Sequence, residues 1–336
     1  MVKIALDACG GDNAPAEIVK GAVEAVNESK DNEIFIYLCG KEALVQAELD
    51  KYSYKKEFIE IINAEEIIET GEPPVNAIRH KKDSSLVKAL YTVKNKEADC
   101  FISAGNSGAI VVGGQTIVGK LKGVERPPLG AVIPTAKGPA LIVDCGGNVD
   151  ARANMLVQWA KMGSAYMEKV MKIDKPRVAI VNVGVEEEKG NQLVKETYPL
   201  LKECKDINFV GSIEARDIPN GDVDIIVCDA FVGNVILKLY EGTAKTLIKM
   251  IKGAIYSSLK SKIGGLLIKG SLKNVLKVMD ATEYGGAPLI GLNGLVVKTH
   301  GNAKAKEIKN AIRQCTDYCN NNVTEVIAKA ITSDAE

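Results

Sequence analysis

The fold follows from the stretch Asp99-Cys-Phe-Ile-Ser-Ala-Gly-Asn-Ser-Gly108, in which a short apolar run passes into a polar turn that contains glycine. Residues Asp99–Ile102 have the continuous hydrophobicity of a buried strand, and a helical pattern follows the turn to about Gly119. Backbone N–H groups stay open where such a turn enters a helix, and they bind anions. The stretch therefore predicts a strand, an anion-binding turn and a helix.

A cationic and hydroxyl-rich segment, Arg79-His-Lys-Lys-Asp-Ser-Ser85, precedes this stretch. It lies at the start of another expected helix, which Asp83 caps and which runs to about Lys96. Fixed positive charge and hydroxyl donors also attract oxyanions, so a phosphate or carboxylate between the two segments would need no metal. The alternative is a solvated basic patch beside an ordinary strand-to-helix turn.

The order of strand, polar turn and helix recurs along the chain. This regularity predicts an α/β fold with a mostly parallel sheet flanked by helices. Five expected strands end in Asp, Ser or Asn with glycine close behind, at Asp7, Ser103, Asp144, Asn182 and Asp229. Ligands of open α/β sheets bind in the crevice beyond the carboxyl ends of the strands. We therefore expect a ligand site at this edge.

Composition excludes several classes of protein. Lys+Arg and Asp+Glu each total 43 and aromatic residues make up only 5%, so we expect no nucleic-acid binding. No apolar run is long enough for a membrane span, and the N-terminus enters a strand without a signal peptide. The eight cysteines form no CxxC pair and there are only two histidines. We expect a cytoplasmic protein without a metal site.

No Pro/Ser-rich linker divides residues 1–336, which we interpret as one catalytic unit of one or two lobes. Within this unit, the sequence pattern of residues 243–280 predicts a projecting, basic, amphipathic helical hairpin. Eight lysines and no acidic residue lie between Thr243 and Met279, and apolar residues recur there at helical spacing.

The tip of this hairpin is expected at Gly264-Gly-Leu-Leu-Ile-Lys-Gly270. Exposed Leu266, Leu267 and Ile268 at a loop tip require a partner, for which we expect an anionic membrane surface. The protein would then be cytoplasmic and peripherally associated with the membrane. The alternative is that both helices form an internal or dimer-interface hairpin whose tip is covered by protein.

Three familiar kinds of catalytic motif are missing. No two glycines are spaced i, i+2, so the dinucleotide fingerprint GxGxxG is absent, as is the GxSxG nucleophile elbow. The Walker-like stretch Gly114–Leu121 lacks the magnesium-binding Ser/Thr and ends a helix where a P-loop must begin one. What remains is group transfer between species of similar energy, driven by orientation and electrostatics.

Six motifs, in the same order and over essentially the whole chain, resemble those of the phosphate acyltransferase family of bacterial phospholipid synthesis. They are Asp7-Ala-Cys-Gly-Gly-Asp-Asn-Ala-Pro15, Arg79-His-Lys-Lys-Asp-Ser-Ser-Leu-Val87, Ser103-Ala-Gly-Asn-Ser-Gly-Ala109, Glu187-Glu-Lys-Gly-Asn191, Cys228-Asp-Ala-Phe-Val-Gly-Asn-Val235 and Tyr284-Gly-Gly-Ala-Pro-Leu-Ile-Gly-Leu-Asn-Gly294. Small departures are Cys9 in place of methionine, Gly147 in place of alanine and Ser107 in place of threonine. Ser107 keeps the hydroxyl.

The resemblance implies an enzyme that converts acyl-[acyl-carrier-protein] and inorganic phosphate into acyl phosphate and free carrier protein, without a cofactor. It also implies a homodimer with a fold like those of isocitrate and isopropylmalate dehydrogenases and phosphate acetyltransferases. The chemistry suits the missing motifs, because a thioester and an acyl phosphate are both activated carbonyls. A downstream membrane acyltransferase is a further expected partner, which would consume the acyl phosphate.

We expect the phosphate site at Ser103, Gly105, Asn106, Ser107 and Gly108, with Lys82 and Ser84 as outer partners. The alternative for Ser103 and Asn106 is that they bond their own backbone within a turn. Candidate catalytic residues are Lys189, Asn234 and His300. Lys189 could be a surface lysine in an acidic loop, Asn234 a helix-start residue and His300 structural rather than a proton carrier.

Two other functions stay open. A phosphate acetyl- or butyryltransferase that uses acyl-CoA would share the fold and chemistry and differ only in the donor. A non-catalytic phosphoryl-ligand or membrane scaffold protein belongs to a different class. Because acyl carrier protein is acidic, a basic docking surface would favour it over acyl-CoA as the donor.

Overall fold

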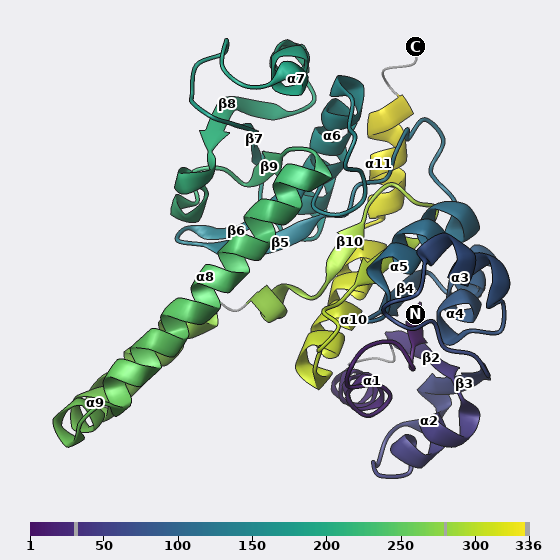
Figure 1. Ribbon diagram of the computed structural model, residues 1–336. Coiled ribbons are helices and arrows are strands. Elements are labelled where there is room, and N and C mark those ends of the chain that lie inside the picture. The colour runs from purple at the N-terminus through teal and green to yellow at the C-terminus, as the bar shows by residue number, and fades with distance from the viewer. Residues whose placement is uncertain (30–32, 279–280, 333–336) are drawn as a thin grey trace.

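Two sheets, each covered by helices, make up the computed structural model, which describes residues 1–29, 33–278 and 281–332 (Figure 1). The first sheet has six strands in the order β10-β11-β4-β1-β2-β3, and the second has five in the order β5-β6-β9-β7-β8. All pairs are parallel except β10 with β11 and β5 with β6. The expected α/β class with largely parallel strands is confirmed.

The first sheet brings the N-terminal third of the chain together with a late segment. Its strands are β1 (Val2–Asp7), β2 (Ile34–Gly40), β3 (Ile59–Asn63), β4 (Cys100–Ser103), β10 (Ala287–Leu289) and β11 (Leu295–Lys298). Strand β4 lies between β1 and β11, and Ser103 at its end is in register with Lys298 at the end of β11. The two strand ends therefore open onto the same edge.

The helices of this half are α1 (Ala16–Glu28), α2 (Glu42–Leu49), α3 (Pro74–His80), α4 (Ser85–Lys94), α5 (Ser107–Gly113), its π-helical continuation η2 (Gly114–Val118) and α10 (Ala305–Asn320). One start differs from expectation. Ser84, rather than Asp83, caps α4, because the Ser84 hydroxyl accepts a hydrogen bond from the Val87 N–H. The Asp83 carboxylate pairs instead with Lys88.

The second half holds β5 (Ala131–Thr135), β6 (Gly138–Val143), β7 (Arg177–Asn182), β8 (Asn208–Glu214) and β9 (Ile225–Val227), with α6 (Ala153–Lys169), α7 (Gln192–Glu203) and α11 (Val323–Thr332). Short 3-10 turns span Lys56–Phe58, Ala215–Asn220 and Ala281–Tyr284. A single buried cluster runs through both sheets, from Ile36 and Ile102 to Val143 and Ile180. The two halves are thus packed together, and the candidate site lies between them, near the ends of their strands.

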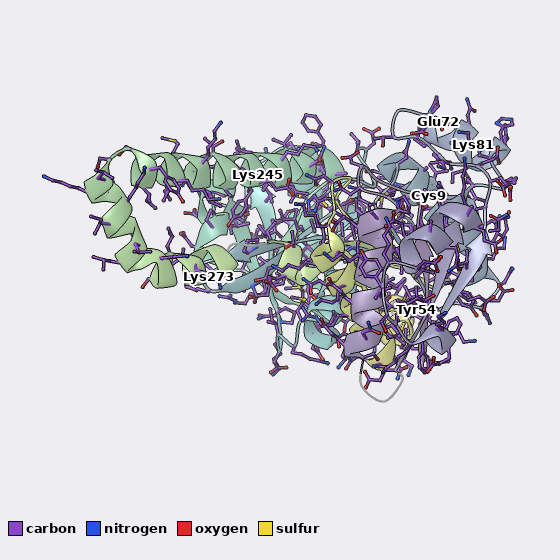
Figure 2. All side chains as sticks on the ribbon, turned by 90° about the horizontal axis from the view of Figure 1, so that it is seen from below. Cys9, Tyr54, Glu72, Lys81, Lys245 and Lys273 are labelled. Carbon is purple, nitrogen blue, oxygen red and sulfur yellow. The ribbon has the colours of Figure 1, made fainter. Side chains whose placement is uncertain are left out.

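Two long helices project from the second half (Figures 1 and 2). Helix α8 (Ala230–Tyr256) is followed by α9 (Leu259–Val278), and the two helices contact each other. The connector expected at Gly264–Gly270 is wrong, since these residues continue α9. The chain turns at Ser257–Ser258, where the Ser258 hydroxyl accepts a hydrogen bond from the Ser261 N–H and so caps the new helix.

Residues 279–280 of the expected hairpin lie outside the described residues. The side chains of Leu266, Leu267 and Ile268 are exposed to 70%, 82% and 54%, as expected. None of the described helices combines the length and the hydropathy that crossing a bilayer requires.

Candidate active site

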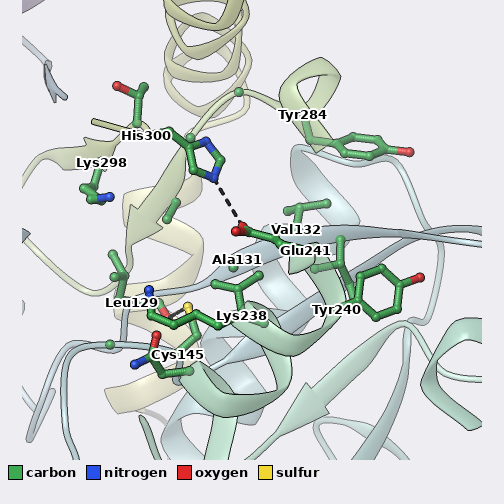
Figure 3. A pocket seen from close by; sticks show the side chains of 18 of the residues that line it. Leu129, Ala131, Val132, Cys145, Lys238, Tyr240, Glu241, Tyr284, Lys298 and His300 are labelled. Atoms are coloured by element: carbon green, nitrogen blue, oxygen red, sulfur yellow. Dashed lines mark hydrogen bonds and ion pairs between the residues drawn. The ribbon is translucent and has the colours of Figure 1, made fainter. Parts of the chain in front are cut away.

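A cavity of about 390 Å³ opens between the two halves (Figure 3). One wall is apolar and comes from β5 and its neighbours, including Leu129, Val132, Ile133 and Pro134. The polar wall comes from three separate segments, which supply Ser107, Asn234, Lys238, Glu241, Lys298 and His300. The cavity can therefore hold a molecule with a charged end and an apolar end.

Helix α8 carries much of the polar wall. The Asp229 carboxylate caps it by accepting hydrogen bonds from the N–H groups of Phe231 and Val232, at 2.9 and 3.0 Å. Asn234, Lys238 and Glu241 then follow at positions i, i+4 and i+7, which share one face of a helix. Their common face explains why all three line the cavity.

His300 lies between two carboxylates. Its Nδ1 is 2.7 Å from Glu307 Oε1 and its Nε2 is 3.3 Å from Glu241 Oε1. Hydrogen bonds to Glu241 and Glu307 raise the pKa of His300 to about 9. At neutral pH the ring is therefore protonated and donates from both nitrogens, which favours a positioning role over that of a general base.

Lys298 enters the cavity from the end of β11 and is partly buried, whereas Lys238 is exposed. Burial lowers the pKa of Lys298, and the nearby carboxylate of Glu307 opposes this shift. Among the residues that the structure describes, no hydrogen bond or ion pair engages the ammonium of either lysine. Figure 3 shows both side chains beside the Glu241–His300 pair.

The expected phosphate-binding turn is closed by its own side chains. The Ser103 hydroxyl donates to Asp7 Oδ2 at 2.7 Å and accepts from the Gly105 N–H at 2.9 Å. The Asn106 amide lies within 3.1 Å of three carbonyl oxygens of residues 69–72, and its oxygen caps α5. Ser103, Gly105 and Asn106 are buried, so these groups hold the turn, and phosphate binding by them remains a prediction.

The other expected phosphate ligands separate into two groups. Ser107 is exposed and lines the cavity, and Gly108 follows it in the first turn of α5 against Pro74. Lys82 Nζ donates to the Ile78 carbonyl at 3.0 Å. Ser84 is fully buried, donates to the Lys81 carbonyl and caps α4. Neither Lys82 nor Ser84 is among the residues that line the cavity.

Of the three candidate catalytic residues, the structure brings Asn234 and His300 together in the cavity with Ser107. Lys189 is not among the lining residues; its ammonium lies 2.8 Å from Glu186, and its side chain is 48% exposed. The next residue, Gly190, lines a second, more apolar cavity of about 340 Å³ beside the start of α8. A catalytic role of Lys189 remains a prediction.

The polar strand ends serve mainly to hold loops in place. Asp144 is buried and accepts hydrogen bonds from the N–H groups of Leu129, Gly146 and Gly147, and burial raises its pKa and that of Asp7. The polar side chains that line the cavity come from residues just beyond these strand ends or from other helices and strands. Lys238, Glu241 and Lys298 are cavity residues that sequence reasoning missed.

Cys145 also lines the cavity, but its thiol is not activated. It donates to the Leu129 carbonyl at 3.0 Å, and burial raises its pKa well above the ordinary value. A thiol held protonated in this way is a poor nucleophile. Across residues 1–29, 33–278 and 281–332, no group of three or more His, Cys, Asp or Glu side chains is arranged to hold a metal ion.

Comparison with known proteins gives a consistent result. The family model described as "Fatty acid synthesis protein" matches residues 2–326. A phosphate acyltransferase of Clostridium perfringens (strain SM101) is 49% identical over 98% of this chain and 97% of its own length. A phosphate acyltransferase of Clostridium botulinum (strain Alaska E43) is 52% identical over 98% of each chain.

A solved phosphotransacetylase from Streptococcus pyogenes has the same fold, with a TM-score of 0.61 and 18% identity over 95% of this chain and 94% of its own. The near-complete matches to curated relatives go further than fold. The chain therefore belongs to the fatty acid synthesis protein family of phosphate acyltransferases, enzymes that transfer an acyl group to phosphate.

Proposed function

We propose that the cavity between the two halves converts an acyl thioester of acyl carrier protein and inorganic phosphate into acyl phosphate and free carrier protein. The observation that carries this proposal is the pairing of a cationic, hydrogen-bonding wall with an apolar wall in one cavity. Phosphate and the reacting carbonyl suit the polar wall, and the start of an acyl chain suits the apolar wall. No cofactor takes part.

The proposed reaction is a direct displacement. A phosphate oxygen attacks the thioester carbonyl, so a C–O bond forms and the C–S bond breaks. The thiolate departs with the bonding electrons and takes up the proton that the hydrogen phosphate loses. Its departure needs little help because a free thiol has a pKa of about 8.5. To the Asn234 amide and the Ser107 hydroxyl, which both line the cavity, we assign the donation of hydrogen bonds to the tetrahedral oxyanion. We assign Lys189 a supporting role in stabilising negative charge.

The choice of carrier protein as donor draws support from charge. Carrier proteins are acidic, and α8 and α9 extend from the cavity with lysines on their surface, including Lys245 and Lys273 (Figure 2). The competing proposal is a phosphate acetyl- or butyryltransferase that takes acyl-CoA. The fold shared with a phosphotransacetylase keeps that proposal open. The third expectation, a scaffold protein without activity, is not carried further, because the chain belongs to a family of enzymes.

The donor is tested by measuring kcat/KM for the same acyl group on carrier protein and on CoA. We expect carrier protein to be preferred at least tenfold, and the preference to shrink as salt screens the docking charges. Equal or better use of acyl-CoA at low and high salt would refute the donor assignment. No acyl phosphate from either donor would refute the proposed reaction itself.

We also propose that α8 and α9 form an amphipathic hairpin that docks on an anionic membrane, so that a cytoplasmic homodimer delivers acyl phosphate to a membrane acyltransferase. We also propose the likeness to the fold of isocitrate and isopropylmalate dehydrogenases that the resemblance implies. The membrane docking is a separate proposal. Its support is the exposure of Leu266, Leu267 and Ile268 among lysines, since each lysine near anionic lipid contributes about 1 kcal/mol.

Vesicle flotation tests this docking. Leu267→Glu should leave turnover with soluble substrates unchanged but release the protein from vesicles of anionic phospholipid. Leu44→Glu is the matched control, because Leu44 is a 49% exposed leucine on α2, away from the helical pair. If Leu267→Glu floats as well as the parent and the control, the pair is not the anchor.

A further inference from the structure

Two lysines reach one cavity from unconnected elements, and no described residue forms an ion pair with either of them. Lys238 comes from the third turn of α8, and Lys298 comes from the end of β11. Within the described part of the chain, neither ammonium has a side-chain hydrogen bond or an ion pair. The charge of Lys238 further lowers the pKa of Lys298.

The carboxylates nearby are already engaged. Glu241 and Glu307 both bind the ring of His300, and Glu307 also accepts a hydrogen bond from the His300 backbone N–H at 2.9 Å. With His300 protonated, this trio alone carries one negative charge. Adding Lys238 and Lys298 gives three cations against two carboxylates. An excess positive charge therefore faces the cavity, in a chain whose net charge is zero.

A partly buried ammonium without a bound anion is costly, because burial removes the water that stabilises its charge. The ordinary remedy is a salt bridge, which Lys298 lacks among the described residues. The turn at residues 103–106 carries no cationic side chain, and the polar side chains of Ser103 and Asn106 are engaged in holding it. The positive charge that a phosphate needs must then come from elsewhere.

We propose that Lys298 and Lys238 bind the phosphate substrate, with Lys298 as its principal ligand, and that the Glu241–His300–Glu307 trio is a positioning group. The inference deepens the function proposed above and rests on phosphate as the acyl acceptor. Lys298 holds the anion at the inner, polar wall, and Lys238 closes on it from the exposed side. The trio keeps both carboxylates from pairing with the lysines, which leaves the ammonium groups free for phosphate.

This arrangement also orders the reaction. Phosphate anchored at the polar wall presents an oxygen toward the middle of the cavity, where Asn234 and Ser107 also face. The acyl carbonyl then meets that oxygen with its chain along the apolar residues of β5. Two ammonium groups favour the dianion of phosphate, which has one proton and whose unprotonated oxygens are nucleophilic. No further reactant is needed.

The test separates phosphate binding from donor binding. Lys298→Met should raise the KM for phosphate about ten- to hundredfold, and Lys238→Met severalfold, while the KM for the acyl donor changes less than about twofold. Lys298→Arg keeps the charge and should recover most of the loss. Lys195→Met is the matched control, because Lys195 is an exposed lysine on α7 that is not among the cavity residues.

Calorimetric titration with inorganic phosphate provides a second readout that needs no acyl donor. Binding heat should be present in the parent and in Lys195→Met and weakened in Lys298→Met. Circular dichroism establishes that each variant is folded. Parental phosphate affinity in folded Lys298→Met would overturn the inference, as would a rise confined to the donor KM. Failure of the carrier-protein proposal is distinguishable, because titration and acyl-CoA turnover still report on phosphate.

Discussion

Replacing Gly233 by alanine should disable the site without touching any polar group in it. Gly233 is buried in the first turn of α8, and a Cβ there would lie 2.0 Å from the carbonyl oxygen of Asp144 and 3.1 Å from the Cα of Cys145. Ordinary contact begins at 3.4 Å, so the two backbones must separate by about 1.4 Å. Neither neighbour is a flexible side-chain end that could move aside.

The expected consequences follow from that displacement. Overpacking of this kind costs about 1–3 kcal/mol of unfolding free energy. A shift of about 1 Å at Asn234, the next residue, should lower kcat/KM about a hundredfold. Both quantities are measured on the same preparation, by denaturant unfolding and by acyl phosphate formation.

Gly253→Ala is the control on the same helix, because no atom lies within 4 Å of its added Cβ. There, alanine should stabilise the helix by up to about 1 kcal/mol and leave turnover unchanged. If Gly233→Ala matches Gly253→Ala in stability and turnover, the close approach of α8 to Asp144 does not position the site.

Three further substitutions test individual residues. His300→Gln should remove about 1 kcal/mol of unfolding free energy below pH 6.5, and the difference from the parent should vanish above pH 9. The reason is that a His300 ring with a raised pKa stabilises the fold only while it is protonated. A pH-independent difference in denaturant unfolding would contradict this. Asn106→Ala should lower the unfolding free energy by about 1–3 kcal/mol and raise the phosphate KM, and a thermally and kinetically parental variant would exclude a role in the turn. Lys189→Ala should depress kcat/KM more than tenfold while stability stays within about 0.5 kcal/mol; retained turnover would make Lys189 a surface residue.

The sequence predicts most of the fold because its strands are buried on both faces. The runs at 100–102 and 295–297 are continuously apolar, and both lie in strands. Strand β8 has no such signal, since it lies at a sheet edge and only Ile213 in it is buried. The turn between α8 and α9 lies at Ser257–Ser258 and not at Gly264–Gly270, because the Ser258 hydroxyl caps α9 and glycine is tolerated within a helix.

The candidate site is predictable only in part, for reasons of topology. Asn234 and His300 follow expected strands, and both line the cavity. Lys238 and Glu241 could have been found from Asn234, because the three share one helical face. Lys298 could not have been found in this way, because it reaches the cavity only when β11 lies beside β4, almost 200 positions earlier in the chain. Strand order of this kind is set by packing between distant segments and leaves no local pattern.

Product analysis tests the central claim most directly. The purified protein is mixed with acyl-[acyl-carrier-protein] and labelled inorganic phosphate, in the presence of a metal chelator and without nucleotide. Released carrier-protein thiol and labelled acyl phosphate are then counted in the same samples. The account predicts one acyl phosphate for each thiol, with no thiol release when phosphate is omitted. Thiol release without acyl phosphate, or product formation that requires nucleotide, would contradict it.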